Sequence, residues 1–123
     1  MALAPLIYYG AVQLAPAGRA ATVSSGFHQL GKVALLKIES AQDGFSESDD
    51  VFNQRLAEAD RSLAVAGAAA HTAADQRDYT RLVTYLHAVK QDHLLMQTAI
   101  DPSQQPDHEQ TNSARQSAES AFQ

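Results

Sequence analysis

The sequence predicts an all-α protein built around a long antiparallel helical hairpin. Two segments carry apolar or small residues at alternating spacings of three and four, which puts them on one face of a helix. A strict seven-residue repeat of this kind makes a coiled-coil-like seam suited to a partner helix. One short polar connection separates the two segments, so the chain must reverse there. The first stripe is Phe52, Leu56, Ala59, Leu63, Ala66, Ala70 and Ala73, and the second is Tyr79, Leu82, Leu86, Val89, His93, Met96 and Ile100.

Residues 1–18 form an apolar segment that we expect to dock against another surface. Residues 3–15 carry no charge, so the basic region that opens a secretory signal is missing, and the run is too short to span a bilayer as a helix. We expect a short helix here that ends at residues 16–18. Its large side chains exceed what one face of a short helix can bury, which indicates contact with another chain. The expected contact residues are Leu6, Ile7, Tyr8, Tyr9, Val12 and Leu14.

Residues 19–45 are predicted to form a further helix. Gly26 and Gly31 weaken that helix, and residues 32–38 also alternate as a strand would. The helix is favoured because a lone hairpin offers no sheet for a strand to join. Gly44 followed by an apolar residue is typical of a Schellman ending. The helical stripe consists of Val23, Phe27, Leu30, Ala34, Ile38 and Ala41.

The hairpin occupies residues 46–100, with helices expected at about 48–74 and 76–100. Serines followed by acidic residues at 46–50 supply an N-cap and negative charge at the positive start of the first helix. Each helix of about 23 residues is roughly 35 Å long.

Folding the chain about residues 74–75 pairs the two stripes. Ala66 then faces Leu82, and Phe52 faces Met96. Small residues meet large ones along this seam, which lets two helices approach closely and still fill the space between them. Three apolar residues flank the stripe of the last helix and must be covered by the N-terminal helices or by another subunit: Val83, Leu94 and Leu95.

The composition changes abruptly at residue 101. Pro102 and Pro106 stop the preceding helix, and residues 103–120 are rich in polar side chains. Such a segment buries too little apolar area to offset its ordering entropy. We therefore expect residues 101–123 to form a flexible polar tail after a single helical domain at 1–100. The alternative is a weak helical face, ordered on a partner, formed by Ala114, Ala118, Ala121 and Phe122.

Charge and cysteine content narrow the class of partner. The formal net charge of −5 disfavours nucleic acid or an anionic membrane as the main partner, since both require a basic face. With no cysteine, the chain has no disulfide framework, thiol catalysis or cysteinyl metal site. The expected location is the cytoplasm or the interior of a macromolecular assembly, without a signal peptide or transmembrane helix.

The chain shows no catalytic or cofactor signature, so we expect no enzyme, no cofactor and no metal. His87 and His93 are six residues apart and point to different sides of one helix, which is not ligand spacing. The acidic residues at 43–50 lack the oxygen pattern of an EF-hand loop and indicate helix capping instead. No nucleophile elbow or phosphate-binding loop is present in the sequence.

The hairpin broadly resembles the subunits of helical secretion filaments and of small phage-particle components. The likeness is architectural and carries no motif, so it implies assembly and transfers no residue. The function expected from the sequence is that of a non-enzymatic structural or adaptor protein that self-associates or docks into a larger assembly. The alternative is a small-ligand or metal-binding helical bundle that uses His87 or His93.

Overall fold

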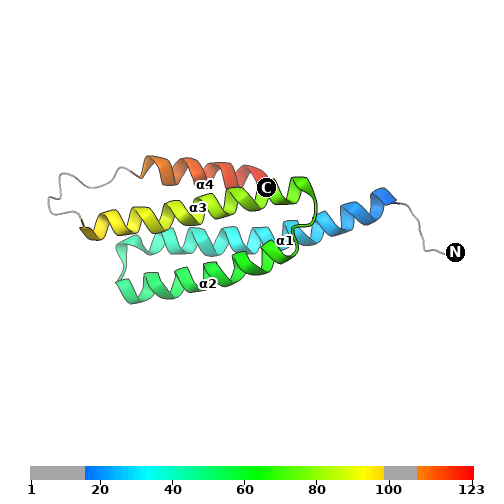
Figure 1. Cartoon of the computed structure of the whole chain (residues 1–123). Helices are drawn as coiled ribbons and strands as arrows, with labels where there is room; N and C mark the ends of the chain where they lie inside the picture. The colour runs from blue at the N-terminus through cyan, green and yellow to red at the C-terminus, as the bar shows by residue number, and fades with distance from the viewer. Residues whose placement is uncertain (1–15, 99–107) are drawn as a thin grey trace.

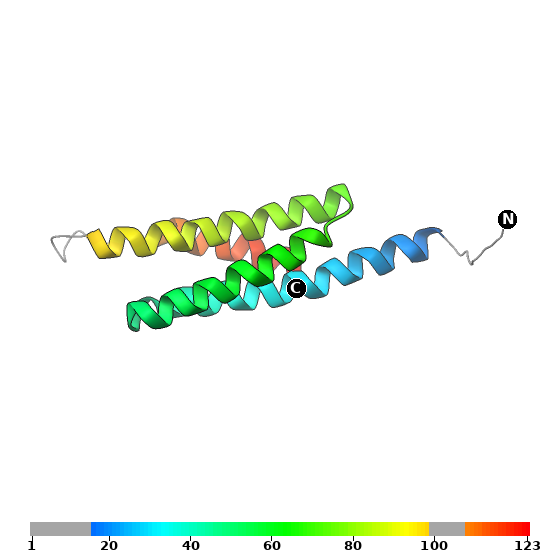
Figure 2. The same ribbon diagram turned by 60° about the horizontal axis from the view of Figure 1, so that its bottom comes forward.

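A computed structural model describes residues 16–98 and 108–123, and this part of the chain is almost entirely helical. The predicted all-α fold is confirmed, and no strand occurs among the described residues. Four helices pack as a small bundle in two pairs, α1 with α2 and α3 with α4 (Figures 1 and 2). Their order is α1 (Pro16–Asp43), the 3-10 turn η1 (Gly44–Ser46), α2 (Asp49–Ala68), α3 (Ala73–Thr98) and α4 (Glu109–Phe122).

The first helix begins where the sequence suggested a stop. α1 starts at Pro16 and continues to Asp43, through the stretch for which a strand was the alternative. The expected helix end at residues 16–18 is therefore wrong. Proline suits the first helical position because its fixed φ is already helical and its missing N–H would have had no intrahelical partner.

The link between α1 and α2 differs from the predicted Schellman ending. Gly44 enters the 3-10 turn η1, and no described glycine has a positive φ. The predicted N-cap is present: Ser48 Oγ accepts a hydrogen bond from the Val51 amide at 3.3 Å. Asp49 and Asp50 lie in the first turn of α2, where negative charge is favourable.

The turn of the hairpin lies at residues 69–72, about four residues before the predicted reversal at 74–75. α2 ends at Ala68, and the hydroxyl of Thr72 accepts a hydrogen bond from the Asp75 amide at 3.0 Å, which caps α3 from Ala73 onward. The earlier turn shifts the register of the seam. Phe52 stacks on His93 rather than facing Met96, with ring centroids 3.7 Å apart.

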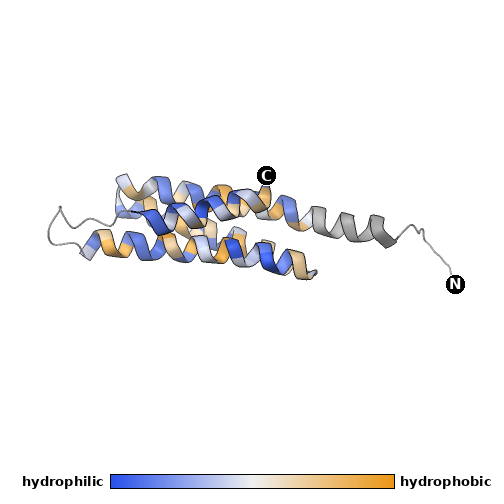
Figure 3. Cartoon of the chain, turned by 90° about the horizontal axis from the view of Figure 1, so that it is seen from above, coloured by the Kyte–Doolittle hydropathy of each residue, from blue (hydrophilic) through white to orange (hydrophobic). Residues whose placement is uncertain are grey.

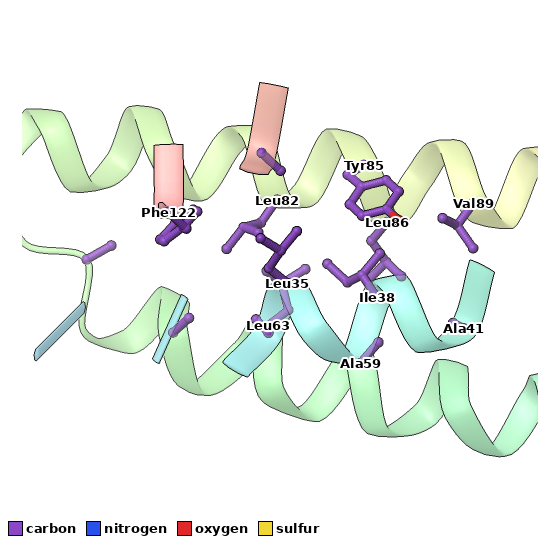
Figure 4. Close-up of a cluster of buried hydrophobic side chains, with 14 of the residues drawn as sticks. Leu35, Ile38, Ala41, Ala59, Leu63, Leu82, Tyr85, Leu86, Val89 and Phe122 are labelled. Atoms are coloured by element: carbon purple, nitrogen blue, oxygen red, sulfur yellow. The ribbon is translucent and has the colours of Figure 1, made fainter. Parts of the chain in front are cut away.

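The core lies between the two helix pairs, and all four helices contribute buried side chains to it. Ile38 and Leu35 of α1 point between α2 and α3 toward Leu63 and Leu82 (Figure 4). Consequently α2 lies mainly along α1, and the direct contact between α2 and α3 is looser than the predicted seam. Apolar and polar residues are interspersed along the coloured parts of the helices, as amphipathic packing requires (Figure 3).

Most of the predicted stripes point into this core. The buried residues of the two hairpin stripes are Phe52, Ala59, Leu63, Ala66, Ala70, Leu82, Leu86 and Val89, and those of the stripe predicted for residues 19–45 are Phe27, Ala34, Ile38 and Ala41. Ala73 is exposed because it begins α3 rather than continuing α2.

The expected polar tail contains a core helix. α4 packs against α3 and α1, and Phe122 near its end is only 2% exposed. The Phe122 ring lies against Gly31, where an added Cβ would come within 2.0 Å of it. Residues 101–123 were expected to be flexible because most of them are polar. This expectation is wrong, because Ala118 and Phe122 share one face of α4 that packs against α1 and α3.

Candidate functional site

A cavity of about 240 Å³ lies between α3 and the start of α4. Its α3 wall is a face of that helix different from the hairpin seam, and its other wall is the first two turns of α4. The residues around it are Thr84, His87, Ala88, Gln91, Asp92 and Leu95 from α3, and His108, Glu109, Gln110, Thr111 and Ala114 from the start of α4.

A buried carboxylate, Asp92, is the centre of the polar contacts at this cavity. Its side chain is 4% exposed. One of its oxygens, Oδ2, lies 2.5 Å from Nδ1 of His108 and accepts a hydrogen bond from the Thr111 hydroxyl at 3.0 Å. The other oxygen, Oδ1, is buried and has no hydrogen-bond partner within the described part of the chain. Of the two carboxylate oxygens of Asp92, only Oδ2 therefore has hydrogen-bond partners in the described part of the chain.

The position of Asp92 explains how α4 is attached at its beginning. Both partners of Oδ2 come from the first turn of α4, whose unpaired amides make this end electropositive. The carboxylate therefore acts as an anchor supplied by a neighbouring helix.

His108 reaches this contact in an uncommon backbone conformation. Its φ of 61° and ψ of 8° make it the only described non-glycine residue with a positive φ. Histidine is among the side chains found more often in this left-handed region, at a cost of order 1–3 kcal/mol. The bond to Asp92 offsets part of that cost, so the backbone and the polar contact depend on each other.

The hydrogen bonds of this cluster are made between protein groups. Asp92 orients an imidazole, but no hydroxyl is hydrogen-bonded to His108 among the described residues. Thr111, the nearby hydroxyl, points to Asp92 and to the Ala88 carbonyl. Within residues 16–98 and 108–123, no group of three or more histidine or acidic side chains is placed to hold a metal ion.

The two histidines singled out from the sequence occupy different environments. His87 lines the cavity beside Asp92. His93 lies on the opposite side, stacked on Phe52, with Nε2 3.6 Å from the Asp49 carboxylate. The structure thus separates them: His93 is a packing residue of the seam, whereas His87 remains next to a site.

The predicted interface residues of α3 lie at the surface. Val83, Leu94 and Leu95 are 39%, 52% and 54% exposed. The interface residues predicted nearer the N-terminus lie outside the described residues: Leu6, Ile7, Tyr8, Tyr9, Val12 and Leu14. Three exposed aliphatic side chains were not singled out as contact residues, and they lie on α1 and α2: Val33, Leu36 and Val65.

The sequence pattern did not indicate a role for Asp92, His108 or Thr111. A signal was present on α3, where Tyr85, Val89 and Asp92 follow each other at spacings of four and three. This second stripe runs beside the first one and faces a further helix. Nothing local to His108 or Thr111 indicated that this helix would be α4.

A second polar cluster fastens the middle of α4 to α1. Arg115 Nε donates to Glu39 at 2.9 Å and to Glu119 at 3.4 Å. Burial raises the pKa of Glu39, and the hydrogen bond between the two carboxyl groups lowers the pKa of Glu119. The nearby hydroxyl of Tyr85 donates to the amide oxygen of Gln42 at 2.5 Å, and burial raises the pKa of this phenol well above its ordinary value of 10.0.

The raised pKa of Tyr85 predicts a loss of stability in alkali. Above pH 10.0 the unfolded chain loses the phenolic proton while the folded chain keeps it, so folding becomes less favourable as the pH rises. Tyr85 makes the free energy of unfolding fall with pH, and the slope that it adds approaches about 1.4 kcal/mol per pH unit. Urea unfolding from about pH 8 to about pH 11 measures it. Tyr85→Phe should lower stability at the start of this range and flatten the alkaline slope; equal slopes in both proteins would contradict the assignment.

Comparison with family models, curated proteins and solved structures finds no match to this chain. In the described ranges, no helix combines the length and the apolar character needed to cross a membrane.

Proposed function

We propose that this protein is a non-enzymatic structural or adaptor subunit that works by association, in the first instance with copies of itself. The observation that carries the proposal is the set of exposed aliphatic side chains. In the described part of the chain, six large ones are between 39% and 65% exposed, although the bundle has a well-filled core. Single exposed apolar residues are normal on a soluble protein, but grouped ones are typical of contact surfaces.

The exposed side chains lie on both helix pairs. Leu94 and Leu95 are adjacent near the end of α3, and Val83 lies on the same helix. Val33 and Leu36 are one turn apart on α1, which packs along α2 with its Val65. Two different apolar surfaces on one chain are what a head-to-tail contact between copies requires, because such a contact joins unlike patches.

The net charge and the helical hairpin also support a protein that acts by association with other proteins. A net charge of −5 favours a protein partner over nucleic acid. The likeness of the hairpin to subunits of secretion filaments and phage particles is compatible with repeated assembly, and the places of action that fit are the cytoplasm or the assembly itself.

Sedimentation equilibrium of purified protein tests the proposal. The intact chain, 13.2 kDa as a monomer, should show a mass that rises with concentration. Val83→Gln combined with Leu94→Gln should shift this equilibrium toward the monomer, because amide groups would then be desolvated at the contact. Gln97→Ala changes an exposed polar residue of the same helix and is the matched control. A double variant that associates as strongly as the unchanged chain would exclude this surface.

A further inference from the structure

We propose that the exposed face of α3 pairs antiparallel with the same face of a second copy, so that association begins with a two-fold symmetric dimer. This inference rests on the proposed function, because it names the partner of the α3 surface and the register of the contact. Three observations carry it: the spacing of the exposed residues on α3, the separation of its two apolar positions, and the charge and area of the face.

An outer stripe runs along the side of α3 that faces away from the core. Its members recur at alternating spacings of three and four, as in the seam that faces the core, but all of them are exposed. Residues at these spacings form one row along a helix, the arrangement that packs against a second helix. The outer stripe consists of Thr80, Val83, His87, Lys90, Leu94 and Gln97.

The two apolar positions of the outer stripe match each other when two copies of α3 run antiparallel. If Val83 of one copy faces Leu94 of the other, then Leu94 of the first copy also faces Val83 of the second. Between these two apolar layers, each His87 faces Lys90 of the other copy. A shift of the pairing by one heptad would place Val83 opposite His87 and Leu94 opposite Gln76. Only one register therefore joins apolar to apolar residues, and the polar centre helps to specify it.

The exposed side chains of α1 match the outer stripe less well. Val83 and Leu94 are separated by about 16 Å along α3, whereas Val33 and Leu36 are separated by only about 4.5 Å along α1. In a head-to-tail contact, the two side chains of α1 could therefore cover only one of the two on α3. A two-fold contact covers both of them in each copy, which favours pairing between like faces.

The charge of the outer stripe permits contact between copies of an acidic chain. The chain has 14 acidic and 9 basic residues, so two copies repel each other at most surfaces. The outer stripe contains no acidic residue, and its lysine is already paired within its own copy, with Lys90 Nζ 3.2 Å from Asp60 Oδ1. Low charge at the centre of a contact is typical of protein interfaces.

The area of the face sets the strength of the dimer. In this register the two α3 helices overlap over about 20 residues, or about 30 Å. A strip of that length and about 15–20 Å wide, one helix with its flanks, buries about 900–1,200 Å² in total over both copies. Stable complexes bury about 1,600 Å², and roughly 1,000 Å² is the lower limit for a specific contact. The dimer should therefore form reversibly, with a mass that depends on concentration.

Cross-linking of single cysteines measures the register, because the chain has no cysteine of its own. Thr80→Cys and Gln97→Cys change exposed positions of the outer stripe and leave both apolar residues in place. In the proposed dimer residue 80 of one copy faces residue 97 of the other, whereas two copies of either residue lie about 25 Å apart. An equimolar mixture of the two full-length variants, treated with a short bis-maleimide, should give a covalent dimer of twice 13.2 kDa. Each variant treated alone should remain monomeric.

Two controls separate a specific contact from random collision. Gln116→Cys is exposed on α4 rather than α3, and it should not cross-link to Thr80→Cys. Val83→Gln combined with Leu94→Gln, added to both cysteine variants, should abolish the covalent dimer. Because each substitution occurs twice in a two-fold contact, the dissociation constant should rise about a hundredfold.

Substitutions on the other surface distinguish a two-fold contact from a head-to-tail one. Val33→Gln combined with Leu36→Gln should leave a reversible dimer, whose mass in sedimentation equilibrium approaches twice 13.2 kDa. In a head-to-tail contact, the same variant would lose association as completely as the Val83→Gln/Leu94→Gln variant.

Four results would overturn the inference. If the mass of the unchanged chain rises with concentration but the cysteine mixture gives no covalent dimer, the two-fold contact is wrong and the proposed function stands. Cross-linking of each cysteine variant with itself, but not in the mixture, would show a parallel pair. Loss of association in the Val33→Gln/Leu36→Gln variant would show a head-to-tail contact. A chain that stays at 13.2 kDa at every concentration would overturn both the inference and the proposed function.

Discussion

Leu63→Asp is expected to unfold the bundle at room temperature. Leu63 is 7% exposed and lies in the centre of the core beside Leu35, Ile38 and Leu82 (Figure 4). The substitution removes about 2–5 kcal/mol of apolar packing and buries a carboxylate that has no partner there. Because domains of this kind are stable by only about 5–15 kcal/mol, most of that stability is lost. Circular dichroism at 222 nm and its thermal melt provide the measurement.

Ala64→Asp is the control for this change. Ala64 is the next residue of α2 and is exposed, so the same aspartate costs only its lower helix propensity, about 0.7 kcal/mol. A Leu63→Asp protein that melts like the Ala64→Asp protein would show that Leu63 does not face the core.

Phe122→Ala should detach or strongly destabilise α4. The Phe122 ring is buried against Gly31 and packs on Phe27 and His28, each with a ring centroid 5.6 Å away. Truncation of a buried phenylalanine typically costs about 3–5 kcal/mol. The expected result is faster amide exchange throughout α4 and a lower melting temperature. Ser120→Ala, at an exposed position of the same helix, should be nearly neutral, and a Phe122→Ala protein that behaves like it would contradict the docked helix.

Because Gly31 and Phe122 are in contact, Gly31→Ala should change stability in opposite directions in the presence and in the absence of the Phe122 ring. Gly31→Ala in the unchanged chain places a methyl group within 2.0 Å of the ring, so α4 must move and stability falls. When Phe122 has already been replaced by alanine, that obstacle is gone. Gly31→Ala should then stabilise α1 by about 1 kcal/mol through its better helix propensity. The same effect in both backgrounds would mean that the two residues do not touch.

The heptad stripes predicted the helices because periodicity is a local property. Leu63, Leu82 and Val89 lie in the core as their spacing required. Periodicity does not identify the partner of a stripe, however. The predicted seam joined α2 directly to α3, whereas Ile38 of α1 occupies the space between them. The position of the turn was also missed, since it depends on the cap formed by Thr72.

The sequence pattern outlined the apolar face of the last helix, formed by Ala114, Ala118, Ala121 and Phe122, but it identified neither the surface that this face covers nor the cavity. Composition correctly showed that α4 has few apolar residues, but Phe122 gains its burial from a groove made by helices remote in sequence. The contact of Asp92 with His108 joins residues on either side of the connection after α3. Its existence depends on how α4 is placed, which no local spacing encodes. Val83, Leu94 and Leu95 were easier to identify, because they fall off the stripe of their own helix.

Amide hydrogen exchange of the full chain at low and high protein concentration is the most direct test of association through the exposed surface. If copies meet at Val83, Leu94 and Leu95, amides in the later turns of α3 should exchange more slowly as concentration and sedimentation mass rise. Amides around Gln116 and Ser117, exposed on α4, should exchange at the same rate at every concentration. An exchange pattern of α3 that does not change while the mass stays at 13.2 kDa would contradict self-association through this surface.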